Sequence, residues 1–265
     1  MSPSLEIALR VGAATTVFAA MALWEWRRPR RQLSVGRKPR WPGNLGILAV
    51  DILAVRLLVP ATAVGVALVA TARGWGLFNA VGLPAWAAIP LGVVALDFVI
   101  YVQHYVFHHV RVLWRIHRMH HADLDIDVST GLRFHPLEIL LSLAIKMAAV
   151  IVLGVPALAV LIFEVLLNAT AMFNHSNVAL PTRIEPIARW IVVTPQMHQV
   201  HHSIVREETD SNFGFNLPWW DRLFGTYRAR PAAGEDGVTI GLPMFRAVAE
   251  SQIVNLLTQP FRNDQ

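Results

Sequence analysis

Residues 97–121 read DFVIYVQHYVFHHVRVLWRIHRMHH, an apolar run that ends in clustered histidines. The spacing HxxHH occurs at His117, His120 and His121 and again at His198, His201 and His202, and a further i, i+4 pair is formed by His104 and His108. Side chains three or four residues apart lie on one face of a helix, where both rings reach a common point. Neutral imidazole is a ligand for zinc, copper, iron and nickel. The pattern therefore predicts a metal centre with more than one ion, built from histidine on helices.

The composition predicts an integral membrane protein. Hydrophobic residues make up 54% of the chain and charged residues 15%, against about 45 to 50% and about 25% in typical globular domains. Near-continuous apolar stretches cover residues 5–24, 45–70, 83–102 and 137–173. Because a helix needs about 20 apolar residues to cross the hydrocarbon layer, each of the first three stretches predicts one membrane span.

The fourth stretch is too long for one span, and Gly154 and Pro156 interrupt it. Proline inside a helix removes a hydrogen bond and clashes with the preceding turn, so we expect a hairpin of two helices over about 137–153 and 156–173. Both HxxHH clusters can share one centre only if the chain between them crosses the membrane an even number of times, which a hairpin satisfies. The fold class predicted is an all-α membrane bundle of three spans plus this hairpin, with a helical, histidine-rich cytosolic cap.

Basic residues predict the orientation. Seven arginines and lysines lie within residues 27–40, whereas the loop 71–82 contains only Arg73. Basic loops stay in the cytoplasm, so we expect the histidine clusters at the cytoplasmic face, in a bacterial inner membrane. This topological role, with contacts to anionic lipid headgroups, explains the net charge of +5 without a nucleic-acid partner.

Several classes of chemistry are excluded by the residue inventory. The chain contains no cysteine, which rules out thiolate ligands, iron–sulfur clusters and disulfides. It has no GxGxxG, Walker or GxSxG motif, so electrons for a redox reaction must come from a separate protein or cofactor system.

Three polar residues are candidates for orienting the metal ligands. Asp97 lies two helical turns before His104 on the same face, where it would either hold an imidazole or pack between helices. Asp210 and Asn212 lie in the segment DSNFG, which would either bond to a ligand imidazole or simply form a turn.

Over residues 97–228 the chain resembles the fatty acid hydroxylase and sterol desaturase superfamily of integral-membrane non-haem di-iron enzymes. The motifs that carry the resemblance occur in the family's order, at residues 97–108, 117–121 (HRMHH), 133–138 (RFHPLE), 174–177 (NHSN), 198–202 (HQVHH), 212–214 (NFG) and 220–227 (WDRLFGTY).

This resemblance implies a four-helix membrane anchor beneath a cytosolic cap and two iron ions held by histidine. The ligand candidates that it implies are His104, His108, His117, His120, His121, His175, His198, His201 and His202, with no catalytic residue expected beyond the metal centre. His135 is a further candidate, which could instead be a loop residue hydrogen-bonded to Glu138, and His109 is expected to be a non-ligand. Ala171 stands where some relatives place another histidine.

The activity implied is reductive activation of O2 followed by hydrogen abstraction from a lipid C–H bond, which yields an alcohol or an alkene. A separate electron donor of cytochrome or ferredoxin type is implied as well. The substrate class and the choice between hydroxylation and desaturation stay open. Aromatic residues near a membrane surface are more often interfacial anchors. The candidate lining residues for a substrate tunnel are Phe107, Trp114, Phe134, Phe173 and Trp219.

We expect an N-terminal transmembrane anchor at 1–96, a catalytic histidine domain at 97–228 that includes the hairpin 137–173, and a tail at 229–265. Spacing alone does not select iron over zinc. Two alternatives therefore stand beside the oxygenase: a membrane zinc hydrolase, in which a metal-bound hydroxide attacks an ester or amide, and a non-enzymatic metal-handling protein.

Overall fold

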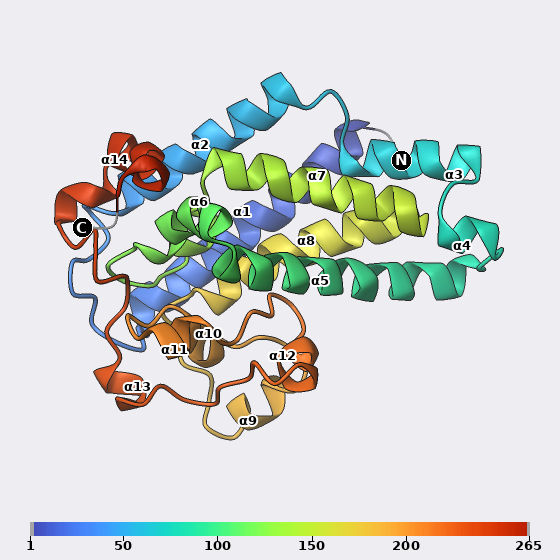
Figure 1. Ribbon diagram of the computed structural model, residues 1–265. Coiled ribbons are helices and arrows are strands. Elements are labelled where there is room, and N and C mark those ends of the chain that lie inside the picture. The colour runs from blue at the N-terminus through green and yellow to red at the C-terminus, as the bar shows by residue number, and fades with distance from the viewer. Residues whose placement is uncertain (1–2, 264–265) are drawn as a thin grey trace.

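The computed structural model describes residues 3–263, and this part of the chain contains helices but no β-strand. Five long helices form the body of the molecule (Figure 1): α1 (Pro3–Arg27), α2 (Trp41–Leu58), α5 (Ala85–His109), α7 (Pro136–Leu153) and α8 (Ala157–Asn174). Five helical stretches are long and apolar enough to cross a membrane. The prediction of an all-α membrane bundle is confirmed, and the chain is an integral membrane protein.

The predicted hairpin is present in the structure. Helix α7 ends at Gly154, which adopts the left-handed conformation with φ 69°, and α8 begins after Pro156. Glycine adopts positive φ without the steric cost that a Cβ atom brings, and proline cannot continue the preceding helix. The chain therefore reverses between these two residues.

The second apolar stretch differs from the single helix that we expected over 45–70. Helix α2 ends at Leu58, and a separate helix α3 runs over Ala63–Arg73, followed by the short α4 (Leu77–Ala80). Pro60 explains the break, because its ring disfavours helical geometry at the residue before it. Val59 accordingly has extended backbone angles.

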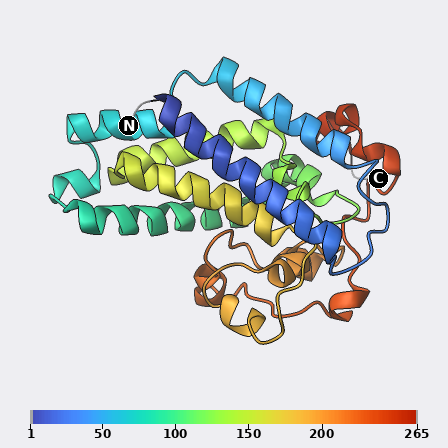
Figure 2. The same cartoon turned by 180° about the vertical axis from the view of Figure 1, so that it is seen from behind.

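The long helices pack around a core that α5 and α8 share. Helix α1 lies along α8, as the view from behind shows (Figure 2), while α3 packs on α7 and α8. Leu96, Val160 and Phe163 are fully buried in this core. Large apolar side chains such as Leu57 and Trp86 are instead exposed on the outside, where a bilayer would cover them.

The remaining helices are short and gather around one end of the bundle and the adjoining side of α5 (Figure 1). They are α6 (Arg111–His121), η1 (Thr130–Leu132), α9 (Glu185–Ala188), α10 (Pro195–His201), α11 (Arg206–Thr209), α12 (Trp219–Leu223), α13 (Gly234–Gly237), η2 (Val248–Ser251), α14 (Ile253–Thr258) and η3 (Gln259–Phe261). Helix α14 packs against α2, and η3 packs against α6. This region contains most of the predicted metal ligands.

Candidate metal centre

Nine buried histidines converge into two groups. The first group contains His104, His108, His117, His121 and His201, and the second contains His120, His175, His198 and His202. Within each group, one ring nitrogen per residue lies within 4.8 Å of those of all the others. These nine residues are the ligand candidates that the family resemblance implied.

Each HxxHH motif is divided between the two groups, which the sequence analysis did not anticipate. In α6, His117 and His121 belong to the first group and His120 to the second. In α10, His198 belongs to the second group and His201 to the first, and His202, which follows the end of this helix, belongs to the second. Residues four apart are offset by about 40° around a helix and residues three apart by about 60° in the opposite direction. The i, i+4 pairs therefore stay together, and the third ring reaches the neighbouring group.

Hydrogen bonds determine which ring nitrogens of the first group are free. The Nδ1 atom of His104 lies 2.8 Å from the backbone oxygen of Phe213, and the Nδ1 atom of His201 lies 2.7 Å from that of Ser211. A carbonyl oxygen only accepts hydrogen bonds, so each Nδ1 carries the proton and each Nε2 presents a lone pair. These two Nε2 atoms are 3.0 Å apart.

The second group repeats this arrangement. His120 Nδ1 donates to the backbone oxygen of Arg133 at 3.0 Å, and His175 Nδ1 donates to that of Ala171 at 2.6 Å. Their Nε2 atoms, again unprotonated, are 3.0 Å apart. Two lone pairs at this distance repel each other unless a cation lies between them, so the donor set fits a metal ion in each group.

Burial excludes a proton as that cation at neutral pH. Desolvation lowers the pKa of His175 to about 4 and that of His201 to about 3. The pKa values of His120, His198 and His202 are also well below the usual value, because of burial and of the neighbouring imidazoles. Neutral imidazoles are the form that binds transition metals.

Two carboxylates hold imidazoles of the first group in place. His117 Nδ1 donates to Glu138 Oε1 at 2.7 Å, and His108 Nδ1 donates to Asp210 Oδ1 at 3.1 Å. The Nε2 atom of His108 is then buried without a hydrogen-bond partner among the described residues. Such a carboxylate fixes the tautomer and orientation of a ligand histidine. The contact of Asp210 with an imidazole was expected, whereas the role of Glu138 was missed, because only tertiary structure brings α7 beside α6.

Asn212 shapes the loop, which is the second of the two alternatives for its segment. Its side chain bonds the backbone of Met197 and Arg228 and contacts no histidine. Its backbone is left-handed, with φ 53°, a conformation that asparagine tolerates better than most residues. The residues on either side, Ser211 and Phe213, provide the carbonyls that bind the two imidazoles. Asn212 thus acts through the shape of the loop.

For Asp97 and His135 the structure agrees with the alternative in which neither residue belongs to the metal centre. Asp97 accepts a hydrogen bond from Trp220 Nε1 at 2.8 Å and holds no imidazole, which agrees with the alternative of a residue packed between elements. His135 caps the start of α7, where its Nδ1 accepts from the backbone N–H of Leu137 and its Nε2 contacts the backbone oxygen of Leu257. The structure therefore brings His135 into neither group. The exposed His109 lies outside both groups, as expected.

A buried ion-pair network fixes the loop after α6. The Nε and Nη2 atoms of Arg40 donate to the two carboxylate oxygens of Asp123, at 2.6 and 2.7 Å, and its Nη1 donates to Asp127 at 2.7 Å. Burial alone would raise the pKa of Asp123, but Arg40 and Arg133 outweigh it and hold this pKa well below its usual range. The network ties the start of α2 to the segment that follows His120 and His121.

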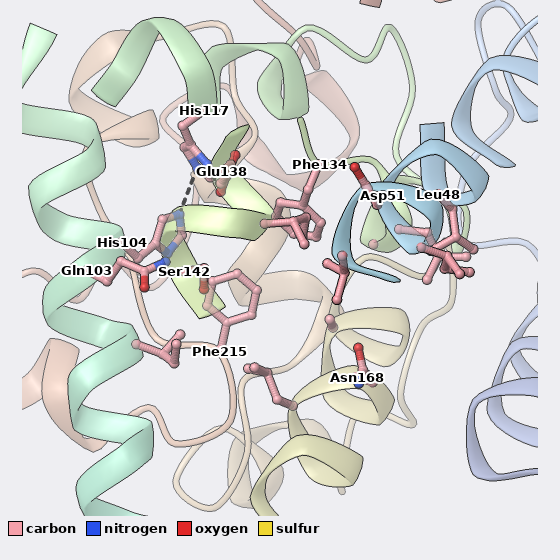
Figure 3. Close-up of a pocket in the computed structure, with 18 of the residues that line it drawn as sticks. Leu48, Asp51, Gln103, His104, His117, Phe134, Glu138, Ser142, Asn168 and Phe215 are labelled. Atoms are coloured by element: carbon pink, nitrogen blue, oxygen red, sulfur yellow. Dashed lines mark hydrogen bonds and ion pairs between the residues drawn. The ribbon is translucent and has the colours of Figure 1, made fainter. Parts of the chain in front are cut away.

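A cavity of about 500 Å³ adjoins the first histidine group (Figure 3). His104 and His117 lie in its wall, and the rest is largely apolar, with Phe107, Phe134 and Phe215 among its aromatic residues. Phe107 and Phe134 thus line a cavity, which agrees with the tunnel alternative for these two residues. The other three aromatic candidates do not: Trp114 packs on the rings of His108 and His121, Trp219 is 47% exposed, and Phe173 is absent from the wall.

Comparisons with known proteins place the chain among lipid-modifying enzymes. The fatty acid hydroxylase family model matches residues 89–226. An ornithine lipid hydroxylase from Rhizobium tropici is 33% identical over 153 residues, which cover 57% of this chain and 45% of its own length. The alkylglycerol monooxygenase of Homo sapiens is 29% identical over 180 residues, which cover 66% of this chain and 38% of its own length.

A very-long-chain aldehyde decarbonylase from Oryza sativa subsp. indica is 25% identical over 159 residues, which cover 54% of this chain and 25% of its own length. The chain thus spans less than half the length of each of these curated relatives. No solved structure matches it significantly.

Proposed function

The chain belongs to the fatty acid hydroxylase family, and on this basis we propose that it is a membrane-bound oxidoreductase that uses O2 to hydroxylate or desaturate a C–H bond of a lipid. The observation that supports this most directly is the meeting of unprotonated Nε2 atoms in two buried groups beside a largely apolar cavity. An apolar chain can enter such a cavity from the bilayer. We assign the catalytic region to residues 97–228.

We assign one iron ion to each group, with five histidine candidates for the first and four for the second. His135 is outside this assignment because both of its ring nitrogens already have partners. When bound, the irons supply reductive activation of O2. Hydroxylation consumes the C–H bond, O2, two electrons and two protons and releases an alcohol and water; desaturation releases an alkene and two waters. The electrons come from a separate cytochrome or ferredoxin.

The protein's own contribution is to hold the ligands, position the lipid and exclude water. Glu138 and Asp210 accept the Nδ1–H of two imidazoles and so keep each Nε2 directed at its group. Phe107 and Phe134 form walls that confine an apolar chain beside His104. A dry, shaped site of this kind places one carbon within reach and protects a reactive species from water.

We propose that the histidine groups face the cytoplasm of a bacterial inner membrane. The basic segment 27–40 supports this orientation, because it lies at the same end as the groups: Asp125, in the loop after α6, accepts hydrogen bonds from the backbone of Ser34, Val35 and Gly36. The chain has no native cysteine, so a single Arg28→Cys variant can be labelled selectively. Protection from a membrane-impermeant maleimide in intact cells, and labelling after lysis, is the expected result.

The proposed function is tested on detergent-purified protein loaded with iron-57. We expect Mössbauer spectra of two coupled irons per chain and O2-dependent modification of lipid extracts, detected by mass spectrometry. His201→Ala should abolish the product while the protein stays in the membrane, and His109→Ala, which alters an exposed histidine outside both groups, should retain it. Product that persists without O2 would instead indicate a zinc hydrolase, and metal flux in proteoliposomes would indicate metal handling.

A further inference from the structure

One carboxyl group in the cavity wall has no role in the metal centre. Asp51 lies on α2, its side chain is only 5% exposed, and its Oδ1 has no hydrogen-bond partner among the described residues. Glu138 lines the same cavity, and its Oε1 holds His117, whereas its Oε2 also has no hydrogen-bond partner among the described residues. A buried carboxyl without a partner is strongly destabilising, so its presence in an apolar helix points to a group that reaches it from outside the chain.

The position of Asp51 suggests where that group comes from. Leu48, Ile52 and Val55 flank it on α2 and line the same cavity. Figure 3 shows Asp51 on α2 and His104 on α5, in opposite walls. A molecule that fills this space would therefore contact the first histidine group with one part and Asp51 with another.

Within residues 3–263, no cationic side chain forms an ion pair with Asp51. Arg56, five residues further along α2, lines the cavity but makes no ion pair with Asp51 among the described residues. Arg10, on α1, is paired with Glu164 instead. Asp51 lies ten residues after Trp41, about 15 Å along the helix axis, so its partner must be carried well into the apolar part of the bundle. A neutral hydroxyl or amide N–H is far less costly to place there than a charged headgroup.

We propose that Asp51 binds a hydrogen-bond donor of the lipid substrate, a hydroxyl or amide N–H, and thereby selects which carbon lies at the histidine groups. That the bound lipid is a substrate rests on the proposed function, but its binding to Asp51 can be measured without turnover. Asp51 lies outside the region matched by the family, residues 89–226, as expected for a residue that recognises one substrate rather than one that performs the shared chemistry.

The test compares two probes with the same apolar chain, hexadecan-1-ol and methyl hexadecyl ether, which has no donor. Purified protein in micelles is titrated with each, and the midpoint of thermal unfolding is followed against the mole fraction of probe. One hydrogen bond to a buried carboxyl makes the alcohol effective at roughly tenfold lower mole fraction than the ether in the wild type. Asp51→Leu should respond equally to both probes, whereas Asp51→Asn, which retains an acceptor oxygen, should keep part of the preference.

Ile52→Leu, in the same wall, is the matched control and should keep the full preference. Asp51→Ala replaces the leucine variant if leucine prevents folding. A wild type that does not distinguish the probes, or an Asp51→Leu variant that still does, overturns the proposal. If the enzyme forms a lipid product but its probe preference does not depend on Asp51, the Asp51 proposal fails and the proposed oxygenase function stands. If the preference depends on Asp51 but no O2-dependent product forms, the Asp51 site stands and the proposed function fails.

Discussion

Replacing Glu138 by leucine should weaken metal binding in the first histidine group and leave the second unchanged. The carboxylate lies 2.7 Å from His117 Nδ1, and both side chains are buried. His117 Nε2 in turn lies 3.1 Å from the Nε2 atoms of His104 and His121. Without the carboxylate, the His117 ring can rotate or change tautomer, so its Nε2 no longer points reliably at the other ligands.

The expected magnitude follows from comparable sites. Loss of the group that orients a ligand histidine typically lowers metal affinity about 10- to 100-fold, or about 1.4 to 2.7 kcal/mol. The second group contains neither His117 nor any partner of Glu138, so its affinity should stay within about twofold of wild type. Glu138→Gln retains an oxygen that can accept the Nδ1 proton, and we expect a loss near the lower limit.

The assay is anaerobic equilibrium dialysis of purified protein against buffered Fe²⁺, with bound iron counted per chain. Wild type should fill both groups over one concentration range, whereas Glu138→Leu should fill in two separate steps. Ser142→Ala, one turn further along α7 in the same cavity wall, is the control and should match wild type. An unchanged isotherm for Glu138→Leu would refute the role of the carboxylate, and equal weakening of both groups would show a general loss of structure.

Three further predictions concern stability. Arg40→Met leaves buried carboxylates unpaired and should reduce the free energy of unfolding by about 3 to 5 kcal/mol, whereas the exposed Arg28→Ala should change it little; both are measured by chemical denaturation in micelles. Gly131→Ala would place a Cβ atom 2.6 Å from a backbone oxygen of α8 and should cost about 1 to 3 kcal/mol in the same assay, while Gly12→Ala, which meets nothing within 4 Å, should be neutral or slightly stabilising. The pKa of His175 is lowered to about 4 in the folded protein, so as the pH falls the unfolded chain takes up this proton first. His175 should therefore lower the free energy of unfolding of the metal-free protein by about 1.4 kcal/mol for each pH unit from about pH 6.5 down to about pH 4, and have no effect above pH 6.5. A free energy of unfolding that stays constant between pH 6.5 and 4 would contradict the burial of His175 as a neutral ring.

Local patterns in the sequence were sufficient to predict the hairpin and the candidate ligands. Gly154 and Pro156 determine the break between α7 and α8, because glycine adopts the left-handed conformation without steric cost and proline cannot continue the preceding helix. Pro60 likewise indicates the break between α2 and α3, whereas hydrophobicity alone predicted one span over 45–70. Spacing also predicted that His104 and His108 would point the same way, since four residues nearly complete a helical turn.

Contacts between distant segments could not be predicted in this way. Helical periodicity gives the direction of a side chain relative to its own helix, but the partner depends on how helices far apart in the chain pack. For this reason the sequence left two alternatives open for Asp97, an imidazole or packing between helices, and the structure places it on Trp220. Glu138 likewise holds His117 rather than His135.

The sequence by itself determined the class of protein and the helical bundle, because hydrophobicity, residue type and spacing are local properties. Spacing together with the family resemblance supplied the candidate imidazoles. Only the tertiary structure decided how those imidazoles divide into two groups, which nitrogen of each ring is free, and where the cavity lies beside them. Those features depend on backbone carbonyls such as those of Phe213 and Ala171. Every residue has such a carbonyl, so its position in space, and not its identity in the chain, makes it part of the site.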